Sequence, residues 1–355
     1  MSKKIQGRRN FSKKKSTYSK IRTWLYRLLI GIGLFYGSIF LWPVVPSTPN
    51  IEEPAVFKVK IKPQSGLASI SSQLQDQGLS TPTIVFQISA KALFVGSKLK
   101  PGTYLLQTRS SLGSVLLKIA RGDRVKESLA IIPGMSIWQL RAAVDSHPAL
   151  IHDTKNMNSK ELLKRLNLNY PGLEGLFLPD TYVFDPDDQD LEIYRRASQA
   201  MQKQLSQAWS QKEVGSPLKS PYELLILASI VEKETGRLVD RALVAAVFTN
   251  RLNKNMMLQT DPTVIYGIGP KFDGNLRKAD LRKDSPYNTY MHTGLPPTPI
   301  AMPSKESLQA AIHPAASKAL FFVAKGDGSS HFSESLSDHE AAVDQFQRKL
   351  KPASR

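Results

Sequence analysis

The chain has 355 residues, contains no cysteine and carries a formal net charge of +18. Without cysteine the protein forms neither disulfides nor thiolate metal sites, and a cysteine nucleophile is excluded. The length predicts two domains plus appendages, at about 100 to 200 residues per domain. The excess charge is concentrated at one end, because ten of the 48 basic residues precede residue 28 and the first acid is Glu52.

An uncharged, apolar run follows this basic leader. No residue from 28 to 45 is charged, and Trp24 and Trp42 stand near the two ends of the run. On a helix these tryptophans would lie about 27 Å apart, which is close to the hydrocarbon thickness of a bilayer. Tryptophan favours both membrane interfaces, so the pattern is typical of a transmembrane helix with an anchor at each end.

We therefore predict one membrane-spanning helix over residues 24–45. The positive-inside rule leaves the basic tail of residues 1–23 in the cytoplasm and places the rest of the chain on the other side of the membrane. A cleaved signal peptide is the alternative, which the long leader and the lack of a small-x-small site before Pro46 disfavour. Orientation and anionic lipid explain the polybasic tail, so inner-membrane lipid is the expected partner and no nucleic acid is expected.

A proline-rich linker over residues 46–55 separates the predicted span from folded chain. Beyond it, residues 57–62 alternate apolar side chains with lysine, as in a half-buried strand, and apolar residues then recur at helical spacing up to Gly78. Together with the later segments, this pattern predicts a small α+β module over residues 56–132 without a catalytic constellation. The later segments are helices over 84–94 and 112–119 and strands over 102–106 and 129–132.

The larger domain, predicted over residues 133–350, begins with mostly helical patterns. One interruption is Glu174-Gly-Leu-Phe-Leu-Pro-Asp-Thr-Tyr, which is too rich in glycine, proline and aromatic residues for a helix. It places Glu174, Asp180 and Tyr182 on an irregular, surface-accessible segment that lines a site or forms a turn packed by Phe177. The helices of this domain are expected over residues 137–144, 160–166, 191–209, 220–236 and 240–252.

The helix predicted over residues 220–236 has both ends marked. Ser220 can cap the first turn within a capping box, and Gly236 can end the helix. On a helical wheel, Glu232 and Glu234 flank an apolar stripe on its two edges. A carboxyl held against apolar packing has a raised pKa and can serve as a general acid, although most glutamates on helices are simply solvated.

The two glutamates lie about 200° apart around the helix, so they cannot both face one groove. Glu234 is nearer the helix end, where its carboxyl can project toward a polar loop system over residues 258–303. We therefore predict Glu234 as the general acid and base, and Glu232 as an anchor that pairs with a basic or tyrosyl neighbour. The loop system is dense in amides, hydroxyls and tyrosine rings, which suit a neutral sugar, so a carbohydrate groove is expected.

Other chemistries lack their usual residues. The six histidines show no compact ligand spacing, so neither a metal site nor any other cofactor is expected. Neither a Gly-x-Ser-x-Gly elbow nor a phosphate-binding Walker loop occurs, which disfavours serine hydrolysis and nucleotide hydrolysis.

Six motifs resemble the MltG (YceG-like) family of endolytic murein transglycosylases in order and spacing, over roughly residues 57–345. Among them the Gln-Thr-Asp-Pro-Thr-Val block is highly specific. The motifs are Val231-Glu-Lys-Glu-Thr, Asn250-Arg-Leu, Leu258-Gln-Thr-Asp-Pro-Thr-Val-Ile-Tyr-Gly, Tyr287-Asn-Thr-Tyr, Gly294-Leu-Pro-Pro and Ala311-Ile-His-Pro.

The resemblance implies an inner-membrane enzyme of overall α+β class, with a single transmembrane helix, a LysM-like module and a mixed α/β catalytic domain. It implies cleavage of the MurNAc–GlcNAc bond within peptidoglycan strands, which leaves 1,6-anhydro-MurNAc ends and terminates or trims nascent chains. In this family one carboxyl protonates the glycosidic oxygen and then removes the proton of the sugar's own 6-hydroxyl. No water is consumed and no second carboxylate nucleophile is required. The family pattern also favours Glu234 as this carboxyl.

The expected substrate-binding residues are Glu232, Asn250, Gln259, Asp261, Tyr266, Tyr287, Asn288 and Tyr290. Four of them are candidates for stabilising the oxocarbenium-like transition state or orienting the glycan, namely Gln259, Asp261, Tyr287 and Asn288. Two alternatives stay open, a muramidase-type hydrolase whose products carry water's oxygen and a noncatalytic glycan-binding scaffold. Peptidoglycan strands are the expected substrate, and synthases of the elongation or division machinery are possible partners.

Overall fold

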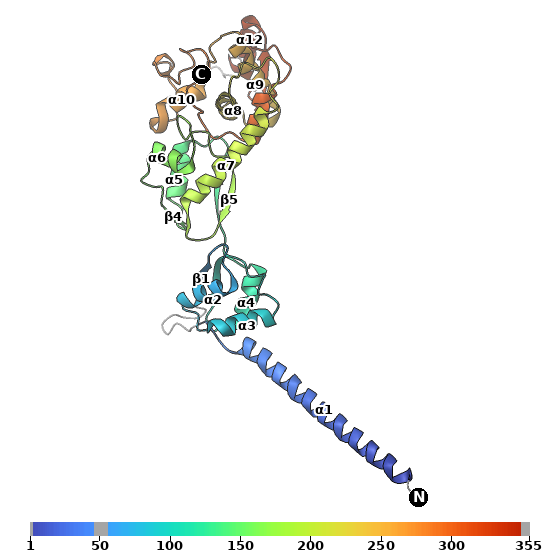
Figure 1. Cartoon of the computed structure of the whole chain (residues 1–355). Helices are drawn as coiled ribbons and strands as arrows, with labels where there is room; N and C mark the ends of the chain where they lie inside the picture. The colour runs from blue at the N-terminus through green and yellow to red at the C-terminus, as the bar shows by residue number, and fades with distance from the viewer. Residues whose placement is uncertain (1–2, 46–55, 349–355) are drawn as a thin grey trace, which may run out of the picture. The chain divides into compact units, whose positions relative to one another are not determined.

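The computed structural model describes residues 3–45 and 56–348, with side chains from Ser19 onward, and the chain folds as two compact units (Figure 1). Unit 1 is Met1–Lys126 and unit 2 is Glu127–Arg355. The linker predicted over residues 46–55 lies outside the described residues. The mixed α+β class expected from the sequence is confirmed.

Unit 1 begins with one long helix, α1 (Lys3–Leu41), which continues from the basic leader into the apolar run. Its stretch Ser19–Leu41 is long and apolar enough to cross a membrane, and only 6% of the apolar window is buried within the protein. The helix ends at Leu41, because Pro43 has no N–H to continue the hydrogen-bond ladder. The apolar helix predicted over residues 24–45 is therefore present, with its end four residues earlier.

The remainder of unit 1 is an antiparallel strand pair covered by three helices. Along the pair, Val56 faces Gln107 and Ile61 faces Gly102. Tyr104 and Leu116 are among the fully buried side chains of the core between strands and helices. The elements are β1 (Val56–Ile61), α2 (Leu67–Asp76), α3 (Thr83–Ala92), β2 (Gly102–Gln107) and α4 (Leu112–Arg121).

The boundary between the units lies earlier than the sequence predicts. Strand β3 (Glu127–Ile131), which we placed at the end of the module, pairs antiparallel with β5 (Asp180–Phe184) of unit 2. Leu129 and Ile131 are buried in the core of unit 2. The predicted division at residue 132 is therefore corrected to Lys126, because the apolar face of β3 is covered by unit 2.

Unit 2 is built around α8 (Pro221–Glu234), which contacts four other helices (Figure 1). All eight residues from Leu224 to Val231 are buried, so this helix is enclosed on all sides rather than along the single stripe that the sequence predicts. The helices around it are α7 (Asp190–Trp209), α9 (Leu238–Asn253), α10 (Asp261–Ile268) and α11 (Lys305–Ile312).

The other elements of unit 2 are short. The strands form two-stranded sheets, β3 with β5, β4 with β6 in parallel, and β7 with β8. The elements are α5 (Ile137–Asp145), β4 (Leu150–Ile151), α6 (Ser159–Leu166), β6 (Asp188–Gln189), η1 (Gly269–Lys271), η2 (Asp280–Arg282), β7 (Phe321–Ala324), β8 (Ser330–Ser333), α12 (Leu336–Val343) and η3 (Asp344–Arg348).

The ends of α8 agree only partly with the prediction. The hydroxyl of Ser220 accepts a hydrogen bond from the backbone N–H of Glu223 at 3.2 Å, as expected of an N-cap. The Glu223 carboxylate, however, accepts from the N–H of Lys219 at 2.6 Å, so the reciprocal half of the capping box is not formed. At the other end Thr235 is already extended, and the helix stops at Glu234 instead of at Gly236.

Two loop predictions also need correction. The polar stretch over residues 258–303 contains α10, which begins at Asp261 with Pro262 in its first turn. The segment predicted to be surface-accessible is mostly buried, since Glu174 and Phe177 are 2% and 0% exposed. Phe177 packs edge-on against Tyr194 of α7 at 5.2 Å between ring centroids, which draws the segment into the core.

Gly175 offers a test of how tightly this segment is packed. Its φ of +79° is disfavoured for other residues, and an added Cβ would lie 2.6 Å from Cβ of Pro299. We expect Gly175→Ala to lower the free energy of unfolding by about 2 to 4 kcal/mol, through backbone strain and overpacking. Denaturant unfolding of the detergent-solubilised chain measures this change.

Gly172→Ala is the matched control, three residues away. No atom lies within 4 Å of its added Cβ, and its φ lies outside the left-handed region. Its unfolding free energy should stay within about 0.5 kcal/mol of the parent. Equal midpoints for Gly175→Ala and Gly172→Ala would show that the Glu174 segment is not packed as described.

Candidate functional site

The carboxyl group of Glu234 lies at the point where α8 ends and the polar loops begin. The hydroxyl of Thr260 donates a hydrogen bond to its Oε1. Burial raises the pKa of Glu234 above its ordinary value, and the charge of Asp261 raises it further, while the Thr260 hydrogen bond and the charge of Arg251 act in the opposite direction. A half-buried carboxyl with a raised pKa keeps its proton to a higher pH than an exposed one and can give it up to a bound substrate.

Three buried threonines fix the hydroxyl that faces Glu234. The backbone N–H of Thr260 donates to the Thr289 hydroxyl at 3.1 Å, and the Thr263 hydroxyl donates to the Thr260 carbonyl at 2.8 Å. The hydroxyls of Thr263 and Thr289 are themselves 2.9 Å apart. Because these contacts join two separate loops, the orientation of Thr260 is set by the fold and not by solvent.

Arg251 fixes the same loop through hydrogen bonds to backbone carbonyls. Its Nη1 donates to the carbonyl of Leu258 at 2.8 Å, and its Nε donates to the carbonyl of Leu320 at 2.7 Å. Burial lowers the pKa of Arg251, and the nearby Glu234 and Tyr290 act against that change. Arg251 therefore fixes the chain before Thr260 and places a positive charge near the Glu234 carboxyl.

Three of the predicted substrate-binding residues lie around this centre. Gln259 precedes Thr260, is exposed and has a φ of +50°, in the left-handed region that glutamine rarely adopts. Its backbone N–H donates to the Thr289 carbonyl at 3.0 Å. The hydroxyl of Tyr290 donates to Oδ1 of the exposed Asp261 at 2.6 Å. Gln259, Asp261 and Tyr290 thus present polar groups beside Glu234.

The two other predicted tyrosines belong to an aromatic cluster next to this centre. Tyr266 stacks on Trp138 at 5.0 Å between centroids, and Tyr287 meets Tyr266 edge-on at 5.0 Å. The hydroxyl of Tyr287 lies 2.9 Å from that of Thr298. These contacts tie α10 to the N-terminal turn of α5 and to the loop that carries Tyr287.

A pocket of about 270 Å³ opens beside this cluster. It is bounded by Lys233, which directly precedes Glu234, and by Pro262, which directly follows Asp261. Its walls combine aromatic faces with polar groups, which is the surface chemistry that a sugar ring requires. The lining residues are Gly134, Ser136, Trp138, Gln139, Lys233, Pro262, Ile265, Tyr266, Gly269, Pro270, Phe272 and Ile300.

Glu174 is a second carboxyl with an altered pKa, and it lies beneath the aromatic cluster. Burial raises the pKa of Glu174 to about 7, against the opposing effects of the Ile137 N–H, Tyr266, the Gly175 N–H and the charge of Lys233. The N–H of Ile137 lies 3.1 and 2.9 Å from the two carboxyl oxygens. Glu174 thus joins its own segment to the start of α5 and to α10.

The structure gives Glu232 internal partners. Its side chain is 4% exposed and pairs with Nη2 of Arg241 at 2.9 Å. It also accepts from the backbone N–H and the hydroxyl of Ser304, at 2.8 and 2.5 Å. The expected pairing with a basic neighbour is therefore present. Its oxygens are engaged by α9 and the start of α11, and the role of Glu232 in substrate binding stays a prediction.

The side-chain amides of Asn250 and Asn288 also serve the fold. Asn250 donates to the carbonyls of Ser317 and Ala319, at 2.8 and 2.9 Å. Asn288 is 1% exposed and donates to the carbonyl of Lys283 at 2.8 Å. The structure thus shows the amide donors of both asparagines engaged by backbone carbonyls, and their contact with the glycan stays a prediction.

One further group of acidic and imidazole side chains lies away from α8. Ligand atoms of Asp145, His152 and Asp190 all lie within 4.8 Å of one another. Both carboxylate oxygens of Asp190 lie 3.2 Å from the Thr154 N–H, and one also accepts from its hydroxyl at 2.8 Å. Asp190 therefore anchors the Thr154 loop at the start of α7.

Sequence reasoning missed the residues that position Glu234. The motif Leu258–Gly267 contains Thr260 and Thr263, and the motif Tyr287–Tyr290 contains Thr289. In both motifs we predicted roles only for acidic, amide and aromatic residues. Small hydroxyl residues inside a specific motif were the available signal. Arg251 and Trp138 carried no comparable signal, because their partners are backbone carbonyls and a distant tyrosine.

Comparison with known proteins shows what the chain is similar to. The model of the YceG-like family matches residues 59–345. A protein of Bacillus subtilis strain 168 named endolytic murein transglycosylase is 30% identical over 345 residues, which cover 90% of this chain and 91% of the relative. A relative of the same name from Streptococcus pneumoniae D39 is 28% identical, and the match covers 90% of this chain and 63% of that protein.

A solved structure is similar as well. The crystal structure of a yceG-like protein from Listeria monocytogenes superimposes with a TM-score of 0.51 at 28% identity. The match covers 81% of this chain and 99% of that structure. The matched family region contains α8, the three threonines and the aromatic cluster. On the extent of these matches, the chain belongs to the YceG-like family.

Proposed function

We propose that the chain is a membrane-anchored lytic transglycosylase that cleaves peptidoglycan strands internally, with Glu234 as its catalytic acid and base. The observation that carries this proposal is the half-buried Glu234 carboxyl, which the Thr260 hydroxyl orients among exposed polar side chains. The name of the Bacillus and Streptococcus relatives supports the same reaction class.

The reaction uses the two protonation states of Glu234 in turn. The protonated carboxyl gives its proton to the glycosidic oxygen, and the bond between that oxygen and C1 of MurNAc breaks. The resulting carboxylate then accepts the proton of the MurNAc 6-hydroxyl while O6 bonds to C1, which closes the 1,6-anhydro ring. Glu234 is protonated again at the end, and water is not a reactant.

The opposing influences on the pKa of Glu234 suit this cycle. Burial and the charge of Asp261 favour the protonated form that starts the reaction. The Thr260 hydrogen bond and the charge of Arg251 stabilise the carboxylate that exists midway. Because both partners are fixed before substrate binds, they need little reorganisation during the reaction.

The glycan lies along the loops that surround Glu234. Gln259, Asp261 and Tyr290 contact the sugars next to the cleaved bond, since they flank Thr260 and are solvent-accessible. The pocket beside Trp138 and Tyr266 takes a neighbouring sugar ring against its aromatic faces. Tyr287 orients Tyr266 through their edge-on contact.

The remaining assignments concern location. We propose that α1 is a single-pass anchor in the inner membrane, with the N-terminus in the cytoplasm and both folded units in the periplasm. The strand pair and helices of residues 56–126 form a LysM-like module that accompanies the catalytic unit. Synthases that polymerise the glycan strands of the elongating or dividing wall are the partner class implied by this location and substrate.

The central prediction concerns two variants of neighbouring glutamates. Glu234→Gln should retain the parent's unfolding midpoint and its binding to purified glycan strands, but lose at least about 100-fold in the rate of anhydro-end formation. The amide can neither donate the acid proton nor accept one from the 6-hydroxyl. Mass spectrometry of sacculus digests measures the products.

Glu232→Gln is the matched control, with the same chemical change two residues away. It leaves Arg241 buried without its carboxylate, so the unfolding free energy should fall by about 3 to 5 kcal/mol, and any loss of rate should follow the loss of folded protein. An active Glu234→Gln beside a folded but inactive Glu232→Gln would assign the chemistry to the other carboxyl.

Glu174 makes stability depend on pH in a defined window. Its pKa rises from 4.5 to about 7 on folding, so folding favours its protonated form. This contribution is fully present below about pH 4.5 and is lost as the pH rises through about 7, for a total of up to about 3 kcal/mol. Unfolding free energies of the parent and of Glu174→Gln between pH 4.5 and 8 measure it.

The amide of Glu174→Gln does not titrate, so the decline in stability between pH 4.5 and 7 should be shallower in the variant than in the parent. Parallel pH profiles for the two proteins would contradict the placement of a buried, titrating carboxyl under the aromatic cluster.

A further inference from the structure

Helix α3 of unit 1 exposes an apolar face. Ile84 and Ile88, one helical turn apart, are 71% and 50% exposed, and Val85 beside them is 47% exposed. Phe94, two residues after the end of the helix, is 80% exposed. Single exposed apolar side chains are ordinary, but four large ones along one short stretch form a contiguous patch that points to a partner surface.

The conformation of Phe94 shows that its exposure is built into the fold. Its φ of +56° lies in the left-handed region, which a bulky aromatic residue rarely adopts. The N–H of Phe94 donates to the carbonyl of Lys91 at 3.0 Å. The N–H of Val95 donates to the carbonyl of Ala90 at 2.9 Å. Val95 is buried, so the chain fixes Val95 inward and directs Phe94 away from the core.

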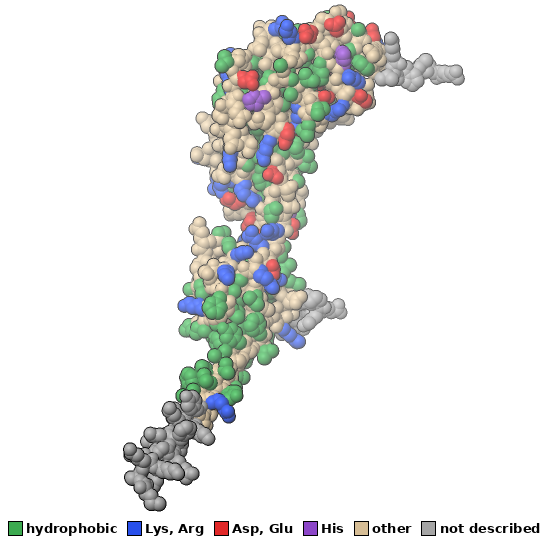
Figure 2. Space-filling model, turned by 90° about the vertical axis from the view of Figure 1, so that its right-hand side faces the viewer, with side chains coloured by type: hydrophobic (Ala, Val, Ile, Leu, Met, Phe, Trp, Pro, Cys, Tyr) green, Lys and Arg blue, Asp and Glu red, His purple; other side chains and the backbone are tan. Residues whose placement is uncertain are grey.

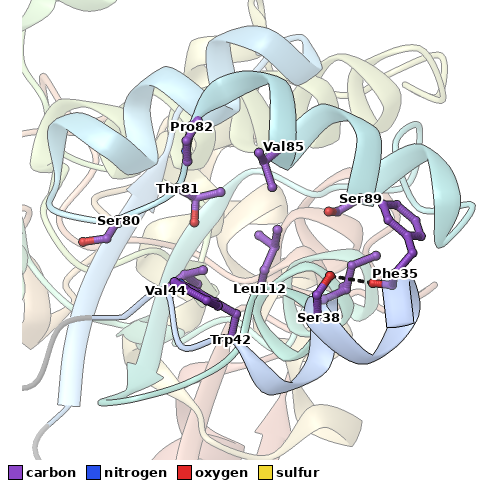
Figure 3. A pocket seen from close by; sticks show the side chains of 11 residues that line it. Phe35, Ser38, Trp42, Val44, Ser80, Thr81, Pro82, Val85, Ser89 and Leu112 are labelled. Atoms are coloured by element: carbon purple, nitrogen blue, oxygen red, sulfur yellow. Dashed lines mark hydrogen bonds between the residues drawn. The ribbon is translucent and has the colours of Figure 1, made fainter. Parts of the chain in front are cut away.

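A pocket of about 350 Å³ lies between α3 and the end of α1 (Figure 3). It is bounded by Phe35, Ile39 and Trp42 from the last turns of α1 and just beyond it, and by Val85 from α3. Figure 2 shows hydrophobic side chains gathered over this part of unit 1. The complete lining is Phe35, Ser38, Ile39, Trp42, Val44, Ser80, Thr81, Pro82, Val85, Ser89 and Leu112.

Specific contacts attach the end of α1 to this module. The hydroxyl of Tyr36 donates to the carbonyl of Ala92 at the end of α3, at 3.0 Å. The N–H of Val44 donates to the carbonyl of Ser110 at 2.9 Å, and the N–H of Ser80 donates to that of Val44 at 2.9 Å. The apolar surface of α1 is therefore continuous with the pocket and with the exposed face of α3.

The charge of the module identifies the kind of surface that it meets. Residues 56–126 contain eleven Lys and Arg against two acids, Asp76 and Asp123. Lys91 and Lys98, on either side of Phe94, are both exposed. An apolar face bordered by basic side chains matches a membrane interface, where acyl chains meet anionic headgroups.

We propose that the module lies on the membrane that α1 crosses, with the α3 face and Phe94 inserted among lipid chains and the pocket occupied by a phospholipid acyl chain. This inference rests on the proposed anchoring by α1 and is independent of the chemistry at Glu234. The continuity of the pocket with α1 favours lipid over a soluble protein, because Phe35, Ser38 and Ile39 of its lining belong to the apolar helix itself.

The cysteine-free chain permits a direct test by single labels. Ile88→Cys and Phe94→Cys, each carrying an environment-sensitive fluorophore, are compared in nanodiscs that contain phospholipids spin-labelled along the acyl chain. The control is Asp123→Cys, an exposed position close to the end of unit 1. We expect lipid quenching at 88 and 94 to exceed that at 123 several-fold, and an aqueous quencher to give the reverse order.

A label at Leu29→Cys separates this inference from the anchoring on which it rests. Leu29 is exposed in the middle of the apolar helix, so lipid should quench it if α1 crosses the bilayer. Lipid quenching at position 29 without quenching at 88 and 94 would overturn only the insertion of the α3 face and Phe94 into the membrane. No lipid quenching at position 29 would overturn both that insertion and the anchoring by α1.

Two other occupants give different results, and each would overturn the lipid assignment. A second copy of this chain would shield positions 88 and 94 in detergent in proportion to protein concentration, without a need for bilayer. A polyprenyl chain of a lipid-linked glycan would produce quenching changes only after that lipid is added to phospholipid nanodiscs.

Discussion

The hydrogen bond from the Thr260 hydroxyl to the Glu234 carboxyl is the contact on which the proposed active site depends. It joins the end of α8, whose residues Leu224 to Val231 are all buried, to the loop that carries Thr260. Hydrogen bonds with Thr263 and Thr289 hold Thr260 in place for this contact. Arg251 binds the carbonyl of Leu258 in the same loop. The surrounding structure therefore orients the Glu234 carboxyl, to which we assign the chemistry in the proposed reaction.

Two glutamates two residues apart show how environment separates their roles. Glu232 is enclosed by Arg241 and Ser304 and fastens α8 to its neighbours. Glu234 reaches the helix end, where burial and the charge of Asp261 raise its pKa, with a hydroxyl as its fixed partner. The same residue type thus serves as a structural anchor at one position and, in the proposed reaction, as a proton carrier at the other.

Much of the fold was predictable where local rules dominate. The apolar run that forms α1, the Ser220 cap and the helices from α2 to α9 follow from periodicity and capping, whereas α10, α11 and α12 were not predicted. Local rules failed where tertiary packing decided the outcome. Strand β3 joined unit 2, the Glu174 segment moved into the core, and Gly236 was not needed as a terminator because Thr235 already turns the chain.

The candidate site was predictable in part for the same reason. Glu234, Gln259, Asp261 and Tyr290 meet around one centre, as the polar loops suggested. The amides of Asn250 and Asn288 resembled sugar ligands in sequence, but their donors are used by backbone carbonyls. Sequence composition identifies groups that can bind a sugar, whereas only the fold shows which of those groups are free to do so.

The claim that one carboxyl performs the reaction without water is tested most directly by the oxygen in the product. Sacculi digested by the purified chain in water enriched in oxygen-18 give new MurNAc ends whose mass can be measured. The account predicts anhydro ends without heavy oxygen, because the sugar's own 6-hydroxyl closes the ring. Reducing ends that carry oxygen-18 would show that water attacks, and that the enzyme is a hydrolase.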